Sequence, residues 1–427
     1  MPFSLLRRRS ICWLIALPLL LPLVSCSLVG SNTPQQHSPT LPNLPSAAKL
    51  QARSFADTWN NIHPFLAFDH DISNPAALAK SYDFVWGAQV SHIAAYRAAN
   101  PSIFLTYYMP FYRDNGAFSN SLATHDLAYW KAIHPDWILY KCDRVTPAYF
   151  ATDPQIPFDF TNPDVISWQI QTYVQPASEK GYDGIAADNV DLGNLFGACG
   201  VYIHGKWVQK YTGQPDDPQW RANVLLWLAR MQAALHSLKH PLALIPNLAL
   251  EVVSPTDPLV EQILRHVDGV VNEVGFTDSG KGYLTDSQWV QMIQFMEHVQ
   301  SLEKPYYVVN QFPSVGHAEI QWALASYLMG KDHLAELFIS TIQGYGAKQQ
   351  YQEYGAQLGN PIDSMQQTQN IYIRRYSQGL SIVNPSTTHS YTVTINGAKH
   401  YRDLYGKSVG QTITLPPHSG IVLVTSS

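Results

Sequence analysis

Gly181-Tyr182-Asp183-Gly184-Ile185-Ala186-Ala187-Asp188-Asn189-Val190 is the stretch that decides the fold. A helix-like segment ends at Gly181, a short apolar run follows, and Asp188 closes that run. A buried strand of a parallel sheet has this pattern, with few polar residues before its carboxyl end. The carboxyl ends of strands carry the chemistry in α/β barrels, so Asp188 is the first candidate for a catalytic carboxylate. The alternative is an aspartate that caps a helix or lies in a loop, because aspartate is common after strands.

The same alternation of strand-like and helix-like runs continues on both sides of this stretch. Eight such repeats predict an α/β fold, a (β/α)8 TIM barrel, over residues 53–365. A doubly wound sheet is the alternative, but it more often carries a Gly-rich phosphate loop, and the sequence contains none. The expected strands are residues 65–68, 83–87, 103–108, 184–188, 242–247, 269–273, 306–311 and 337–340.

The pattern changes near residue 371 to short strands separated by Gly, Asn and Pro turns. This change predicts a small C-terminal antiparallel β-sandwich domain over residues 366–427. Because this segment contains few carboxylates, we expect the chemistry to lie in the barrel. The expected strands are residues 371–376, 380–384, 391–395, 412–415 and 420–424.

The N-terminus has the features of an export signal. Arg7, Arg8 and Arg9 precede an apolar run over residues 11–24, which is short for a membrane span. Leu23-Val24-Ser25-Cys26 resembles a bacterial lipobox, which implies cleavage before Cys26 and lipid attachment to its thiol; ordinary secretion is the alternative. We therefore predict a lipoprotein signal peptide over residues 1–26, a flexible linker over residues 27–52, and a membrane-anchored protein facing outside the cytoplasm.

Composition limits the choice of ligands. Charged residues make up 14% of the chain, below the usual quarter or so, while 24 Tyr and 11 Trp are present. A surface with little charge and many aromatic groups suits a neutral, hydrogen-bonding ligand such as a sugar. The net charge of −5 and the absence of a basic stripe beyond the leader argue against nucleic acid.

Two cysteines remain after the predicted leader, Cys142 and Cys199. In an exported protein such a pair suggests a disulfide, and two free buried thiols are the alternative. Neither cysteine has a Cys or His nearby at ligand spacing, so we expect no metal site there. We expect no cofactor, and we expect a monomer.

Two carboxylates at the ends of expected strands are the candidate catalytic pair. Glycoside hydrolysis needs two carboxyl groups that flank one bond. Asp188 ends the fourth expected strand and Glu273 the sixth, so in a barrel their side chains face one another across the mouth. Glu251, after the fifth strand, is the competing acid.

Other polar and aromatic side chains are candidates for substrate contacts. Asp69, Asp71, Asn247 and Gln311 also follow expected strands and are predicted to bind sugar hydroxyls, unless they satisfy backbone groups instead. Aromatic side chains in the loops are candidates for a stacking platform, although each one alone is more often part of a core. They are Trp86, Tyr108, Tyr202, Trp207 and Phe276.

A family resemblance rests on two segments. Asp159-Phe160-Thr161-Asn162-Pro163 leads, one helix later, to Gly181-Tyr182-Asp183-Gly184-Ile185-Ala186-Ala187-Asp188-Asn189. These segments resemble the "D-x-x-N-P" and "G-[FY]-D-G-[IV]-x-x-D-N" motifs of hypothetical glycosyl-hydrolase-like family 15. Residues 375–384 and 415–420 also look like the β domain that closes many amylase-type chains. The resemblance implies a glycosidase barrel with a nucleophile or base at Asp188 and an acid at Glu251 or Glu273. Amylases carry an Arg two residues before the fourth-strand Asp, where this chain has Ala186, which speaks against an α-glucan substrate.

The sequence thus predicts an exported glycoside hydrolase that cleaves a polysaccharide or oligosaccharide with Asp188 and Glu273. The first alternative is a non-catalytic carbohydrate-binding surface lipoprotein on a degenerate barrel, because fold does not fix function. A metal-dependent polysaccharide deacetylase is a further alternative, for which His70 beside Asp69 and Asp71 offers a faint ligand set.

Overall fold

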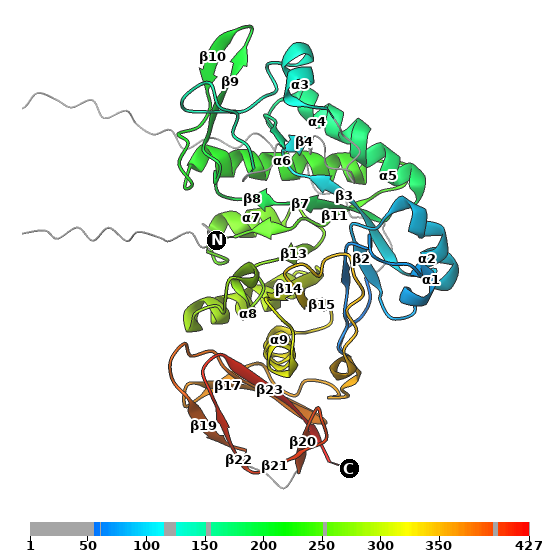
Figure 1. Ribbon diagram of the computed structural model, residues 1–427, viewed down its shortest axis with the longest axis vertical. Coiled ribbons are helices and arrows are strands. Elements are labelled where there is room, and N and C mark those ends of the chain that lie inside the picture. The colour runs from blue at the N-terminus through cyan, green and yellow to red at the C-terminus, as the bar shows by residue number, and fades with distance from the viewer. Residues whose placement is uncertain are drawn as a thin grey trace, which may run out of the picture. The chain divides into compact units, whose positions relative to one another are not determined.

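Parallel strands form the centre of the computed structural model, which describes residues 55–59, 61–114, 125–150, 155–250, 254–395 and 400–426 (Figure 1). One parallel sheet has five strands and a second has three. In spatial order the first contains β1 (Leu66–Ala67), β2 (Phe84–Trp86), β3 (Phe104–Pro110), β7 (Gly184–Asp188) and β11 (Ala243–Leu244). The second contains β13 (Val270–Asn272), β14 (Tyr306–Phe312) and β15 (Ala335–Thr341).

Backbone contacts join the two sheets at both of their edges. Pro64 and Leu337 form a parallel bridge beside β1 and β15, and Asn247 and Val271 form another beside β11 and β13. The Leu337 amide donates to the carbonyl of His63 at 2.9 Å. All eight strands expected from the sequence are present, and each lies next to its neighbours in chain order.

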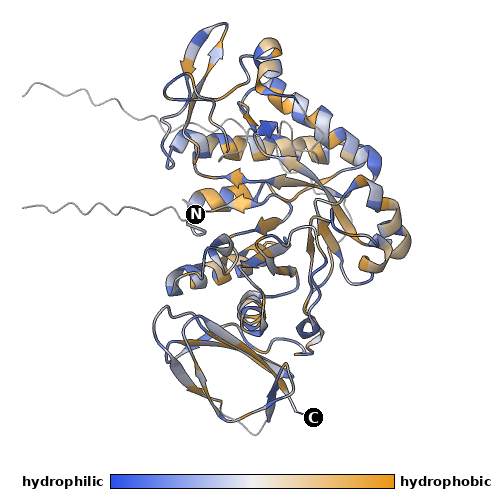
Figure 2. Cartoon of the chain, in the orientation of Figure 1, coloured by the Kyte–Doolittle hydropathy of each residue, from blue (hydrophilic) through white to orange (hydrophobic). Residues whose placement is uncertain are grey.

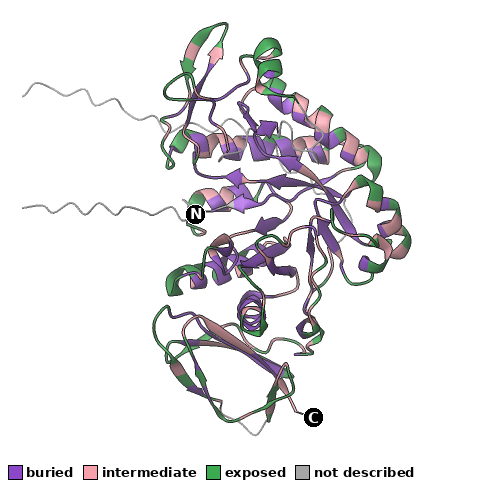
Figure 3. Ribbon diagram, in the orientation of Figure 1, coloured by how far each residue is buried: buried purple, intermediate pink, exposed green. Residues whose placement is uncertain are grey.

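The strands are apolar because both of their faces are covered. Every residue of β7 and β14 is buried, and strands enclosed on both sides are continuous apolar runs rather than alternating ones. Figure 2 shows hydrophobic residues along these strands, and Figure 3 shows them buried beneath helices whose outer faces are exposed.

Four helices begin in the same way, with an Asn or Asp side chain that accepts a backbone N–H and a proline at the start of the helix. Both features favour a helix start, since the cap satisfies a free N–H and proline has none to satisfy. These helices are α1 (Pro75–Leu78), α4 (Pro163–Gln169), α6 (Pro218–His236) and α7 (Pro258–Leu264). The remaining helices that cover the strands include α2 (Ile93–Ala99) and α8 (Asp286–Ser301). Within the described residues, no helix has the length and apolar character needed to cross a lipid bilayer.

The helix that leads into β7 is continuous over three segments. A π-helical turn (Ile170–Val174) connects α4 to α5 (Gln175–Lys180), just before Pro176, which lacks the N–H of a regular helix. The helix ends at Gly181, whose φ of 82° is the left-handed conformation that favours glycine. The chain then enters β7, so this helix stop sets the start of the strand that ends in Asp188.

The chain between β3 and β7, together with the hairpin that follows β7, builds an added lobe. β4 (Arg113–Asp114) pairs with β6 (Ile156–Pro157), and β5 (Tyr140–Lys141), β9 (Ala198–Ile203) and β10 (Lys206–Gln209) form an antiparallel sheet near α3 (Leu127–Ile133). The lobe has its own buried cluster, which includes Trp130, Trp137, Ile138, Tyr140, Ile156, Phe158 and Val165.

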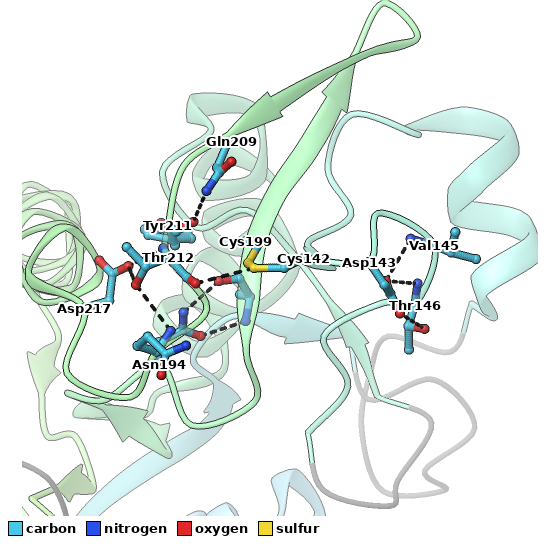
Figure 4. The surroundings of a disulfide bond; sticks show 12 residues. Cys142, Asp143, Val145, Thr146, Asn194, Cys199, Gln209, Tyr211, Thr212 and Asp217 are labelled. Carbon is cyan, nitrogen blue, oxygen red and sulfur yellow. Dashed lines mark hydrogen bonds between the residues drawn. A yellow bond between two sulfur atoms is a disulfide. The ribbon is translucent and has the colours of Figure 1, made fainter.

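A disulfide between Cys142 and Cys199 ties this lobe together, with Cα atoms 5.0 Å apart (Figure 4). Gly213 lies against it, since a Cβ there would come within 2.8 Å of each sulfur. Asn194 holds the turn before β9 by exchanging two hydrogen bonds with the backbone of Ala198, at 2.7 and 2.8 Å. The bond joins the segment before β7 to the loop after it.

The C-terminal segment forms two antiparallel sheets around a separate apolar core. The larger sheet contains, in order, β16 (Gln366–Thr368), β17 (Ile371–Tyr376), β18 (Gly379–Asn384), β23 (Ser419–Thr425), β20 (Tyr401–Asp403) and β21 (Ser408–Val409). The smaller sheet pairs β19 (Tyr391–Thr394) with β22 (Thr412–Leu415). Side chains from both sheets, such as Ile382 and Val393, fill the core.

Helix α9 (His317–Gly330) connects the parallel strands to this β domain (Figure 1). Every residue from Ile320 to Gly330 is buried, as expected of a helix that is apolar on all sides. The guanidinium of Arg374 donates to the carbonyls of Met329 at 3.0 Å and Lys331 at 2.7 Å, which satisfies the end of the helix. The β domain therefore packs against α9 and caps its C-terminal end.

Lys331 at this junction predicts a pH dependence of stability. The side chain is 2% exposed, and burial, followed by repulsion from Arg374, lowers its pKa to about 7. Between pH 7 and 10.5 the unfolded chain therefore binds more protons at Lys331 than the folded chain, so stability rises with pH. We expect wild type to gain about 3 kcal/mol relative to Lys331→Met between pH 7 and 9.5, measured by urea unfolding at each pH. Lys348→Met, at an exposed lysine, is the control and should show the wild-type slope; an equal slope in Lys331→Met would contradict the prediction.

Candidate active site

The structure brings the carboxyl groups of Asp188 and Glu273 together around one amide. Asp188 is the last residue of β7, and Glu273 directly follows β13. The Nδ2 of Asn247, after β11, lies 3.3 Å from Oδ1 of Asp188 and 2.5 Å from Oε2 of Glu273. These two oxygens are therefore separated by at most the sum of the two distances, 5.8 Å. The structure thus brings three of the predicted site residues together, with Asn247 within hydrogen-bond distance of both carboxyl groups.

Asp188 is held by donors from two directions. The hydroxyl of Tyr108 donates to its Oδ2 at 2.9 Å, and Nδ2 of Asn189 donates to the same oxygen at 2.7 Å. Asn189 has a φ of 52°, a left-handed conformation that asparagine tolerates better than most residues. This backbone turn folds the Asn189 side chain back onto its neighbour, so the motif Asp-Asn at the strand end fixes the carboxylate.

Arg113, which the sequence did not single out, adds a positive charge beside Asp188. Its Nη2 lies 4.0 Å from Oδ2 of Asp188, and its guanidinium stacks 3.8 Å from the ring centre of Phe150. The side chain is 1% exposed, and its Nε and Nη1 have no hydrogen-bond partner within the described residues. In a buried place this charge attracts the ionised carboxylate more strongly than it would in water. Amylases carry an Arg two residues before the fourth-strand Asp, where this chain has Ala186. In this chain a cation near the Asp comes instead from Arg113 on β4.

Glu273 is held by Asn247 and by Tyr345. The Tyr345 hydroxyl donates to Oε1 of Glu273 at 2.6 Å. Burial, and then the charge of Glu273, raises the pKa of Tyr345 well above its ordinary value, so the hydroxyl keeps its proton and remains a donor. Tyr345 lies in the loop after β15, a position that no sequence motif distinguished.

The loop that carries Glu273 is fixed by close packing. Gly275 has a φ of 57°, and a Cβ there would lie 1.9 Å from the carbonyl oxygen of Val309, so only glycine fits. The Gly275 amide donates to Oδ1 of Asn272, and the Phe276 amide donates to Oδ1 of Asn310, each at 3.0 Å. Asn310, at a predicted strand end, therefore supports the Glu273 loop.

Asp69 has a different environment from the one expected of a substrate contact. It is 0% exposed, and it accepts hydrogen bonds from the Gln89 amide at 2.8 Å and the Tyr96 hydroxyl at 2.9 Å. The Nδ1 of His92 lies 2.8 Å from its Oδ2. These contacts connect the end of β1 to α2 and to the segment between β2 and α2, which gives Asp69 a structural role.

The other predicted site residues are dispersed. Asp71 is exposed, and its carboxylate lies 3.7 Å from Nε2 of His70. Gln311 is buried on β14, where its Nε2 lies 3.5 Å from the carbonyl of Ile342. Cys26 and Glu251 lie outside the described residues.

Of the predicted aromatic platform, Tyr108 alone contacts one of the two carboxyl groups through a described hydrogen bond. Trp86 and Phe276 are fully buried, and Tyr202 and Trp207 belong to the β9–β10 hairpin. Among the described residues, no three His, Cys, Asp or Glu side chains are grouped so as to hold a metal ion.

Comparison with solved structures finds glycoside hydrolases at low sequence identity. The glycoside hydrolase domain of PelA from Pseudomonas aeruginosa is 13% identical, covering 66% of this chain and 94% of that one, with a TM-score of 0.41. A noncanonic maltogenic α-amylase, AmyB from Thermotoga neapolitana, is 12% identical over 86% of this chain and 89% of that one, with a TM-score of 0.44. The α-amylase of Geobacillus thermoleovorans is 9% identical over 88% and 99%, also with a TM-score of 0.44. No curated protein matches the chain.

A family profile matches most of the chain directly. The profile of hypothetical glycosyl hydrolase family 15 covers residues 97–380, a range that contains Asp188, Asn247, Glu273 and Tyr345. The motifs at residues 159–163 and 181–189 lie in the same range, which confirms the resemblance drawn from them. With the two carboxyl groups and the amide between them inside the matched region, the chain belongs to hypothetical glycosyl hydrolase family 15.

Proposed function

We propose that this protein is a glycoside hydrolase in which Asp188 is the nucleophile and Glu273 the general acid and base. The observation that carries the proposal is the position of Asn247 Nδ2, within hydrogen-bond distance of both carboxyl groups. Two carboxyl groups that close to each other can act on one glycosidic bond. Membership of a glycosyl hydrolase family supports the same reaction class.

The separation of the carboxyl groups supports retention of anomeric configuration. Retaining glycosidases hold the two groups about 5–5.5 Å apart, whereas inverting enzymes need about 6.5–9.5 Å to admit a water molecule. The nearest oxygens of Asp188 and Glu273 lie no more than 5.8 Å apart, below the inverting range. The guanidinium of Arg113 places a positive charge 4.0 Å from Oδ2 of Asp188, the proposed nucleophile.

The proposed reaction proceeds in two displacements. Glu273 gives its proton to the glycosidic oxygen while Asp188 attacks the anomeric carbon, so the leaving sugar departs as an alcohol and a glycosyl ester forms on Asp188. Glu273, now a carboxylate, then takes a proton from water as the water oxygen attacks the same carbon. The ester bond to Asp188 breaks, which frees the sugar and restores both carboxyl groups to their first states.

The surrounding architecture follows from the same proposal. The bridges at both sheet edges support one closed eight-stranded barrel, with Asp188, Asn247 and Glu273 together at its mouth. The leader sequence supports export, with lipid attachment at Cys26 and a membrane-anchored enzyme that acts outside the cytoplasm. A carbohydrate polymer or oligomer is the proposed substrate, with Asn247 and Gln311 as candidate contacts.

The test is release of reducing sugar ends, followed by the stereochemistry of the product. The purified chain is incubated with a panel of α- and β-linked polysaccharides, and new reducing ends are measured. On any polymer that is cleaved, proton NMR within the first minutes should show a product with the same anomeric configuration as the substrate. Inversion would contradict the two-displacement scheme, and a panel without any cleavage would contradict the proposed function.

A further inference from the structure

Phe68, at the end of β1, has a backbone conformation that a large side chain rarely adopts. Its φ is 60°, in the left-handed region, which for a bulky residue is a genuine outlier. Its amide donates to the carbonyl of Trp86 at 2.7 Å, and the next residue, Asp69, is fixed by its contacts to Gln89 and to Tyr96 on α2. Strained residues of this kind persist where their surroundings hold them, and they cluster at functional sites.

The strain turns the Phe68 ring toward the candidate active site. The ring centre lies 5.6 Å from that of Tyr108 and 5.7 Å from that of Tyr345. Tyr108 donates to Asp188 and Tyr345 donates to Glu273. Phe68 therefore packs against both of the tyrosines that hold the two carboxyl groups.

The neighbouring strand end leaves space for this ring. A Cβ at Gly87 would lie 2.7 Å from Cδ1 of Phe68, and Gly87 itself has a φ of 78°. The residues on both sides of Phe68, Ala67 and Asp69, are fully buried, whereas Phe68 retains partial exposure. Phe68 is thus the residue at this strand end that is not fully enclosed, although its ring centre lies 5.2 Å from that of Trp86.

We propose that Phe68 is the apolar platform on which a pyranose ring stacks beside Asp188 and Glu273. The inference rests on the proposed function and deepens it by naming the residue that binds the apolar face of the sugar. An aromatic face packs against the C–H groups of a pyranose, while the polar groups of the sugar remain free for hydrogen bonds. Gly87 and the left-handed backbone place the ring, and Tyr108 and Tyr345 limit its movement.

Binding is measured separately from hydrolysis so that the two proposals stand or fall independently. The parent for this experiment is Asp188→Asn, which retains the site but lacks the nucleophile. Isothermal titration with maltohexaose, cellohexaose and chitohexaose gives the dissociation constant for each sugar. In this parent, Phe68→Leu keeps apolar bulk but removes the aromatic face, and Phe68→Tyr keeps the face.

We expect Phe68→Leu to weaken binding of the best sugar about tenfold, and Phe68→Tyr to stay within about threefold of the parent. Thermal unfolding should show all three proteins folded at the titration temperature. Equal affinity of parent and Phe68→Leu would overturn the platform, as would a failure of the parent to bind any of the three sugars. If the parent binds and Phe68→Leu loses affinity while wild type cleaves none of them, the platform stands and the hydrolase proposal fails.

Discussion

Asp188→Asn is expected to lower kcat by roughly a thousandfold or more, on any substrate that wild type cleaves. The amide is nearly the same size as the carboxylate and can still meet Tyr108 and Asn189, so the site keeps its shape. What is lost is the carboxylate of the proposed nucleophile, which lies beside Arg113. The measurement is the steady-state rate of reducing-end release, with circular dichroism to show an unchanged fold. Asp216→Asn, at an exposed loop carboxylate, is the matched control and should retain wild-type kcat.

A second variant identifies Asp188 as nucleophile rather than as a supporting charge. Asp188→Gly opens space beside the anomeric carbon, and added azide can enter it and attack in place of the carboxylate. With an aryl glycoside of the cleaved sugar, the phenolate leaves and a glycosyl azide of inverted configuration forms. Recovery of activity with azide supports the assignment. An Asp188→Asn variant with wild-type kcat would remove Asp188 from the mechanism.

The sequence was sufficient to predict the order of the strands that build the site. Each predicted strand of the parallel sheets has a counterpart in the structure, because a strand covered on both faces must be apolar along its length, a signal carried by adjacent residues. Asp188, Asn247 and Glu273 could be located because each is a polar residue at the point where such an apolar run ends. The carboxyl ends of parallel strands lie at one edge of the sheet, so three residues far apart in the chain could be predicted to lie close together.

Contacts between distant segments were not predictable in this way. Arg113 reaches Asp188 across 75 positions of the chain, the difference between their numbers, through β4, a two-residue strand without a local pattern. Tyr345 reaches Glu273 from a loop after β15. Asp69 was predicted to contact substrate because it follows a strand, but the structure surrounds it with partners from α2 and from the segment between β2 and α2. One signal for that role was present, since His92 and Tyr96 are four residues apart and so share a helix face.

Glu273→Gln is expected to slow the enzyme according to the leaving group. A sugar alkoxide is a poor leaving group and needs the proton of Glu273, so kcat on an oligosaccharide should fall by roughly a thousandfold. A 2,4-dinitrophenyl glycoside leaves as a stable phenolate without protonation, so the first displacement on it should retain most of its rate. Asn247 and Tyr345 can still form hydrogen bonds with the glutamine side chain, which therefore stays in place. The fall in kcat then results from the missing proton donor and not from a displaced side chain.

The leaving-group dependence separates an acid from a merely structural carboxylate. The rate of dinitrophenolate release in the first turnover is compared with the rate of oligosaccharide cleavage, for wild type and for Glu273→Gln. Glu179→Gln, at an exposed position of α5, should leave both rates unchanged. Equal losses on both substrates would mean that Glu273 supports the site without donating a proton, and Glu251 would become the acid to test. A selective loss on the oligosaccharide, together with loss of the alkaline limb of the pH–rate profile, is the pattern that only proton donation by Glu273 produces.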